Sequence, residues 1–186
     1  MRLAALVWLA AAFILAPVHA EERTLHKEVV VKAPIAEVWN AWTTTEGIKT
    51  FFAPDAHVEA RPDGPFEIYM NPYAEPGMRG ADGMRFLALQ PMSMLSYTWN
   101  APPSLPEARK QRTLVIVRFA PAGENETRVG LTHTGWGDGG EWDKAYLYFD
   151  KAWDKVLGNL QKRFADGPID WSEWLSRLRS PPGTKK

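Results

Sequence analysis

The chain has 186 residues with 22 basic and 22 acidic side chains, so its formal net charge is zero. A near-neutral chain without basic clusters argues against nucleic-acid binding, which depends on neutralising backbone phosphates. The chain contains no cysteine, which excludes disulfides, thiol catalysis and thiolate metal sites, and its length suits one domain with a sizeable core.

The first 20 residues, MRLAALVWLAAAFILAPVHA, have the pattern of a secretory signal peptide. Arg2 precedes an apolar stretch over residues 3–16, and Val18 and Ala20 are small residues three and one positions before a signal peptidase cut. The apolar stretch is shorter than the roughly 20 residues of a membrane span, although an uncleaved anchor is the alternative. We therefore expect cleavage after Ala20, export to a bacterial periplasm, and no stable membrane span after cleavage.

The folded part is expected to begin with one strand and two short helices. Residues 24–34 alternate as a strand does. Pro34 suits the first turn of a helix over residues 34–43, because proline has a helix-compatible φ. A second helical piece spans residues 45–52 and ends before Pro54.

Six further strands are expected to form three pairs: residues 57–62 with 65–72, 83–91 with 94–102, and 112–121 with 126–136. The dipeptide Asp63-Gly64 favours positive φ and predicts a tight turn in the first pair. Residues 101–111 are rich in proline and predict an irregular surface loop.

After Gly140 the apolar period changes from two to 3.6, which predicts a helix over residues 141–164. Its apolar stripe consists of Trp142, Ala145, Phe149, Ala152, Trp153, Val156 and Leu160. This stripe has to be buried, so the helix is expected to cover a sheet in an α+β layer.

Residues 169–186 form a separate unit with a short amphipathic helix and a tail expected to be disordered. Asp170 and Glu173 have the spacing of a capping box. Trp171 and Trp174 lie on the apolar face of this helix. Two roles remain open for them: covering the domain, or docking a partner.

Three segments together resemble the START-like (SRPBCC) superfamily, and within it the branch related to the activator of heat-shock protein 90 ATPase. The segments are VVVKAPIAEVWNAWTTTEGIKTFFAP, MLSYTWNAP, and TRVGLTHTGWGDGGEWDKAYLYFDKAWDKVLGNLQKRF. The resemblance implies a helix-grip fold over residues 21–168, with a curved antiparallel sheet wrapped on the long C-terminal helix. It also implies either an apolar cavity between sheet and helix or a core filled by side chains. Residues 71–83 and 101–112 depart from the minimal pattern and stand where they can reshape a cavity mouth.

The segment LTHTGWGDGGEWDKAY joins the last strand to the long helix and contains His133. His133 shares the inward strand face with Leu131, which places it near the rim of any cavity. One reading makes it a residue that orients a ligand or transfers a proton. The other makes it a core histidine held by hydrogen bonds.

We expect neither a metal ion nor a cofactor. No two histidines of residues 21–186 lie within one helical turn of each other, and no HExxH motif is present. Asp138, Glu141 and Asp143 are expected instead to cap the long helix at its positive end.

The many aromatic residues have two possible roles: they line a cavity for a ligand, or they fill the core. The expected ligand-binding residues are Trp39, Phe52, Tyr69, Phe86, Tyr97, Trp99, His133, Trp136, Tyr146, Phe149 and Trp153. The first functional hypothesis is an exported protein that binds a hydrophobic or aromatic small molecule. The alternatives are a cyclase- or hydrolase-like enzyme using His133 as acid–base residue, and a protein-interaction module that docks through the C-terminal helix. The oligomeric state is left open.

Overall fold

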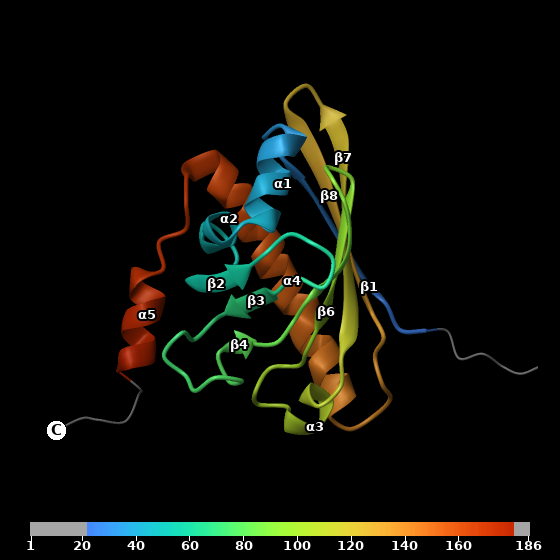
Figure 1. The fold of residues 1–186 in the computed structure, drawn as a ribbon, viewed down its shortest axis with the longest axis vertical. Helices are drawn as coiled ribbons and strands as arrows, with labels where there is room; N and C mark the ends of the chain where they lie inside the picture. The colour runs from blue at the N-terminus through green and yellow to red at the C-terminus, as the bar shows by residue number, and fades with distance from the viewer. Residues whose placement is uncertain (1–21, 181–186) are drawn as a thin grey trace, which may run out of the picture.

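The computed structural model describes residues 22–180 (Figure 1). The expected signal peptide and the end of the chain, residues 181–186, lie outside the described residues. The elements in chain order are β1 (Leu25–Val31), α1 (Ile35–Thr43), α2 (Thr45–Lys49), β2 (Asp55–Val58), β3 (Phe66–Tyr69), β4 (Gly80–Ala81), β5 (Phe86–Gln90), β6 (Met94–Trp99), α3 (Pro106–Arg109), β7 (Thr113–Gly123), β8 (Glu126–Thr134), α4 (Glu141–Asp166) and α5 (Ser172–Arg179). This is the α+β architecture expected from the sequence.

The strands form two antiparallel sheets that bend around α4. One sheet has five strands in the order β1-β8-β7-β6-β5, and the other has three in the order β2-β3-β4. Backbone bonds from Phe66 N to Met84 O at 2.8 Å and from Phe86 N to Gly64 O at 2.9 Å join the two sheets. The result is one curved surface, with the smaller sheet beside α1 and α2 (Figure 1).

All three expected strand pairs are present in the structure. The turn between β2 and β3 is wider than expected, because the strands stop at Val58 and resume at Phe66. Asp63 adopts the positive φ that its turn signal predicted, at 58°. The expected loop over residues 101–111 contains a short helix, α3.

The space between α4 and the five-stranded sheet is filled. Alternate residues of β7 and β8 point inward. Three of them, Val115, Val117 and Leu131, are at most 1% exposed. From α4, Trp153 and Leu160 meet them and are equally enclosed. The expected cavity therefore does not lie between α4 and strands β7 and β8.

The start of α4 differs from the expectation. Its N-cap position is Gly140, and no side chain caps it. Glu141 instead accepts hydrogen bonds from the N–H groups of Glu107 and Ala108, at 2.8 and 3.0 Å, and so serves the first turn of α3. Asp143 pairs with Arg23. The predicted capping was wrong, because these two carboxylates reach across the fold to other segments. Glu141 and Asp143 nevertheless lie in the first turn of α4, at the positive end of the helix, as expected.

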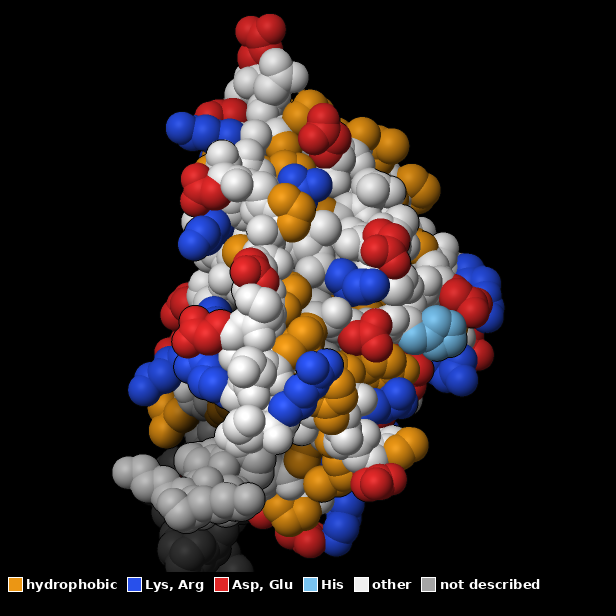
Figure 2. Space-filling model, turned by 90° about the vertical axis from the view of Figure 1, so that its left-hand side faces the viewer, with side chains coloured by type: hydrophobic (Ala, Val, Ile, Leu, Met, Phe, Trp, Pro, Cys, Tyr) orange, Lys and Arg blue, Asp and Glu red, His pale blue; other side chains and the backbone are white. Residues whose placement is uncertain are grey.

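The C-terminal helix α5 lies against the domain beside the smaller sheet (Figure 1). Trp171 Nε1 donates to Lys49 O and Trp174 Nε1 donates to Met70 O, both at 2.7 Å. The capping box is not formed, because Asp170 accepts from Ser172 N and the helix starts at that residue. In this structure the tryptophans therefore cover the domain. On this side of the molecule acidic and basic side chains are interspersed (Figure 2).

Trp174→Phe should raise the amide exchange rates of α5 about fivefold, because a neutral hydrogen bond contributes about 1 kcal/mol. Hydrogen exchange followed by mass spectrometry measures this directly. Ser176→Ala, on the exposed side of the same helix, is the control and should leave the exchange rates unchanged. Equal exchange in all three proteins would mean that the indole bond does not hold the helix.

Among residues 22–180, no helix is both long and apolar enough to cross a membrane.

Candidate ligand-binding pocket

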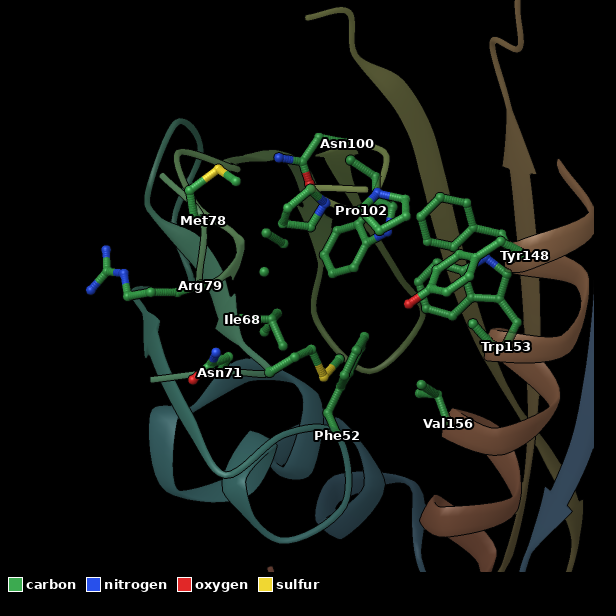
Figure 3. Close-up of a pocket in the computed structure, with 17 residues that line it drawn as sticks. Phe52, Ile68, Asn71, Met78, Arg79, Asn100, Pro102, Tyr148, Trp153 and Val156 are labelled. Carbon is green, nitrogen blue, oxygen red and sulfur yellow. The ribbon is translucent and has the colours of Figure 1, made fainter. Parts of the chain in front are cut away.

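A pocket of about 330 Å³ lies between α4 and the smaller sheet (Figure 3). Its lining is mostly aromatic and aliphatic: Phe52, Ile68, Met70, Asn71, Met78, Arg79, Gly80, Ala81, Trp99, Asn100, Pro102, Pro103, Tyr148, Phe149, Ala152, Trp153 and Val156. Pockets that bind small organic molecules have this size and this apolar character. The pocket opens at the side of the molecule where β4 and the loop after β6 meet.

One wall of the pocket is aromatic. Phe149 and Trp153 come from successive turns of α4 and stack with their ring centroids 5.9 Å apart. Trp99, the last residue of β6, meets Trp153 at 5.5 Å, and Phe52 meets Trp153 edge-on at 6.0 Å. Such tilted and edge-on pairs are favourable for aromatic rings, so the rings hold one another in place and form a preorganised apolar wall.

The two segments that depart from the minimal family pattern supply another part of the lining. Residues 71–83 supply Met78 and Gly80 from one side, and residues 101–112 supply Pro102 from the other. Figure 3 shows Met78 and Pro102 facing each other across the mouth. The departure from the pattern therefore builds the entrance of the pocket.

Arg109 joins these two segments. Its guanidinium group donates to Ala101 O at 2.5 Å and to the carbonyl oxygens of Gly77 and Gly80, both at 2.7 Å. Its side chain is only 12% exposed, and Asp82 lies 3.7 Å from it. Three charge-assisted hydrogen bonds from one enclosed group hold the mouth in a single arrangement.

Asp82 organises the turn before β5. Burial alone raises the pKa of this carboxyl, but hydrogen bonds from Arg79 and from the N–H groups of Gly77 and Gly80 outweigh burial and hold the pKa below its ordinary value. Arg79 Nε binds Asp82 at 2.7 Å, and the Arg79 guanidinium covers the Tyr69 ring at 3.9 Å. In Figure 3 the guanidinium of Arg79 points away from the pocket, so its positive charge pairs with Asp82 and does not face the pocket interior.

Two uncharged polar groups face inward. The hydroxyl of Tyr148 points from α4 toward the pocket (Figure 3), and the residue is 48% exposed, so this phenol stands at the rim. Asn100 follows directly after β6 and is only 5% exposed. No hydrogen bond joins its side chain to any other residue within 22–180.

His133 does not reach the pocket; it is 0% exposed behind the aromatic wall. Trp153 Nε1 donates to His133 Nδ1 at 2.9 Å, so the proton of the neutral imidazole is on Nε2, which meets Thr113 Oγ1 at 2.7 Å. Burial lowers the pKa of His133 to about 3. Both ring nitrogens are occupied, so His133 lies in the core rather than at the expected rim.

The structure brings four of the expected ligand-binding residues together in the pocket: Phe52, Trp99, Phe149 and Trp153. Phe86 and Tyr97 are enclosed in the core around Phe66, whose ring centroid lies 4.8 and 4.1 Å from theirs. They are internal because their strands lie where the two sheets join.

The remaining expected residues lie outside the pocket. Trp39 packs on Phe119 at the α1 end. Trp136 and Tyr146 pair with each other next to His133. Tyr69 lies under Arg79, and burial followed by its hydrogen bond to Glu67 raises its pKa to about 12. These side chains stabilise the fold around the pocket rather than line it.

Aromatic content alone missed the aliphatic and polar half of the lining. Tyr148, Ala152 and Val156 share one face of α4 with Phe149 and Trp153, so helical spacing could have identified them. Asn100 and Asn71 carry no such signal, since only the meeting of two loops brings them to the pocket. Within residues 22–180 no cluster of three metal-ligating side chains is present.

Comparison with known proteins agrees with this architecture. The model of the family described as Activator of Hsp90 ATPase homolog 1-like protein matches residues 32–165. Protein MLL2253 from Mesorhizobium loti has a similar structure (TM-score 0.64, 21% identity), with 79% of this chain and 100% of that chain covered. An AHSA1-like protein from Rhizobium etli is also similar (TM-score 0.57, 22% identity), with 82% and 88% covered. No curated protein sequence matches the chain.

Proposed function

The chain belongs to the family of Activator of Hsp90 ATPase homolog 1-like proteins, and we propose that it binds a small hydrophobic or aromatic molecule in the pocket beside α4. The observation that carries this proposal is the preformed apolar pocket of about 330 Å³ with its aromatic wall. When a ligand covers this apolar surface and removes it from water, binding is favoured by roughly 25 cal/mol for each Å² buried.

The arrangement favours binding over the two alternatives. An acid–base enzyme needs a proton donor or acceptor within hydrogen-bond reach of its substrate. His133 has no open ring nitrogen and stands behind Trp153, so it offers none. Docking through the C-terminal helix needs that helix to be free, whereas both of its tryptophans bind backbone carbonyl groups of the domain.

Filling the pocket should abolish binding. Ala152 lines the pocket from α4, and Ala152→Phe places a ring where a ligand would lie. We expect the affinity for the neutral fluorescent probe N-phenyl-1-naphthylamine to fall at least roughly tenfold, because the apolar surface available to it is lost. Titration of the probe fluorescence measures the dissociation constant.

Lys151→Phe is the matched control, since it adds the same ring to the exposed side of α4. It should bind the probe as the wild type does. Native mass spectrometry of the protein from its own host then shows whether a hydrophobic molecule co-purifies. Equal probe binding by wild type and Ala152→Phe, or no binding by either, would contradict the proposed function.

We also propose that the protein acts after export, as its first 20 residues suggest. The mass of the protein from its host tests this. A chain that begins at Glu21 supports export, and a chain that retains Met1 in the cytoplasm contradicts it.

A further inference from the structure

Asn100 stands out among the residues that line the pocket. It follows Trp99, whose pairing with Thr113 ends the β6–β7 ladder, and it precedes Ala101, whose carbonyl accepts from Arg109. The backbone is therefore held on both sides of Asn100. In Figure 3 its amide is directed toward the space between Met78 and Pro102.

The amide of Asn100 has no partner of its own. A carboxamide offers two donor hydrogens and an acceptor oxygen. The side chain is 95% enclosed, yet no hydrogen bond joins it to another residue of the described chain. Its amide atoms are not among the fully enclosed polar atoms that lack a partner, so they are open to the pocket. Since no other residue of the described chain uses this amide, it is free to bind a group that enters the pocket.

The second asparagine of the lining behaves differently. Asn71 Oδ1 accepts from Tyr73 N at 3.1 Å, so its amide has a structural role in the turn after β3. Asn71 and Asn100 thus form a natural pair for comparison, because both line the pocket and only one has its amide oxygen engaged.

The polar groups that face the pocket are uncharged. Tyr148 contributes a phenol, and Asn100 contributes an amide. The nearest positive charges, on Arg79 and Arg109, are bound to Asp82 and to backbone carbonyl groups. A carboxylate in the pocket would lose its hydration without gaining a free cationic partner.

We propose that Asn100 determines the specificity of the pocket, by pairing with a neutral carboxamide group on a ligand whose aromatic body lies against Trp99 and Trp153. A carboxamide supplies both the acceptor and the donor that the Asn100 amide lacks, so the two groups form a two-point pair. The inference rests on the proposed binding function and deepens it.

Three probes of nearly equal shape test this proposal: 2-naphthamide, the carboxylate 2-naphthoate, and the hydrocarbon 2-isopropenylnaphthalene. Their affinities are measured by displacement of N-phenyl-1-naphthylamine from wild type, from Asn100→Leu and from the control Asn40→Leu, whose side chain is exposed on α1 outside the pocket. In Asn100→Leu the affinity ratio of naphthamide to isopropenylnaphthalene should fall about tenfold, as the loss of a polar pair in the pocket predicts. In Asn40→Leu the ratio should stay unchanged.

Nuclear magnetic resonance gives a direct second measurement. The side-chain NH₂ signals of Asn100 are identified by their loss in Asn100→Leu, and 2-naphthamide should shift them in the wild type. An unchanged affinity ratio in Asn100→Leu, or a wild type that prefers naphthoate to naphthamide, would overturn the role of Asn100 while the binding function stands. If none of the three probes displaces the dye from the wild type, the role of Asn100 falls, whereas a wild type that does not bind the dye overturns the binding function as well.

Discussion

Lowering the pH from about 7.5 to about 5 should lower the free energy of unfolding by about 2 kcal/mol, because the unfolded chain takes up a proton that the folded chain refuses. Burial lowers the pKa of His133 from 6.5 to about 3 in the folded protein. Well above pH 6.5, His133 is neutral in both the folded and the unfolded chain, so its neutral form costs the folded state nothing. Between pH 6.5 and 3 only the unfolded state binds the proton, so stability falls as the pH falls.

The physical cause is the environment of the imidazole. Trp136, Phe149 and Trp153 surround the ring with centroids 4.0 to 5.7 Å away, and no carboxylate is among its hydrogen-bond partners. A proton on Nδ1 would also displace the hydrogen bond from Trp153. Both effects act against the charged form.

Chemical denaturation across this pH range measures the effect, and His133→Gln is the matched control. The Gln amide can accept from Trp153 and donate to Thr113, but it does not titrate. We expect the variant to lose some stability at neutral pH and to show a much flatter dependence on pH. Parallel pH profiles for both proteins would assign the acid sensitivity to other groups.

Arg109→Met should lower the free energy of unfolding by about 3 kcal/mol, because three carbonyl groups lose a charged donor and Asp82 loses a neighbouring cation. The Arg109 side chain is 12% exposed, so water replaces its hydrogen bonds incompletely. Methionine keeps most of the length of the side chain and removes only its polar head. Urea denaturation measures the stability.

The same change should loosen the mouth of the pocket. Hydrogen exchange should rise at residues 77–82 and 101–105, which Arg109 joins, and stay constant in β7 and β8. Arg112→Met is the control, since Arg112 is exposed and its bonds reach only the neighbouring carbonyl groups of Arg109 and Gln111. A control as destabilised as Arg109→Met would show that the clamp has no special role.

These two predictions concern opposite sides of the same aromatic wall. Behind it, His133 accepts a hydrogen bond from Trp153 and is hydrogen-bonded to Thr113. The Thr113 hydroxyl in turn donates to Trp99 O at 3.4 Å. In front of it, Arg109 holds the entrance. The base of the pocket is thus fixed by packing, and its mouth is held in place by one side chain, which is the preorganisation that tight small-molecule binding requires.

Local periodicity in the sequence predicted most of the fold. The alternation in β7 and β8 and the 3.6-residue stripe of α4 are short-range patterns. Each of these elements must bury its apolar face, whatever the arrangement of the rest of the chain. The aromatic wall follows from the same stripe, and Phe149 and Trp153, which the sequence predicts to bind a ligand, both line the pocket. The inward face of His133 was also predictable from alternation, although its depth was not.

The position of the pocket could not be predicted, because it depends on contacts between segments far apart in the chain. Nothing in the local pattern shows that Arg109 binds Gly80, or that Glu141 serves the start of α3 rather than α4. Phe86 and Tyr97 are aromatic like the residues of the pocket wall, yet they are enclosed because the two sheets join there.

The sequence by itself determined which faces of its strands and of its long helix are buried, since side-chain spacing along an element depends only on the element. The tertiary structure decided which buried face stays open to a ligand. Side chains of β7 and β8 fill the space under α4, whereas the short strands of the smaller sheet leave a gap beside α4 that two loops enclose. Whether side chains fill a space depends on the distance between elements, which no single segment specifies.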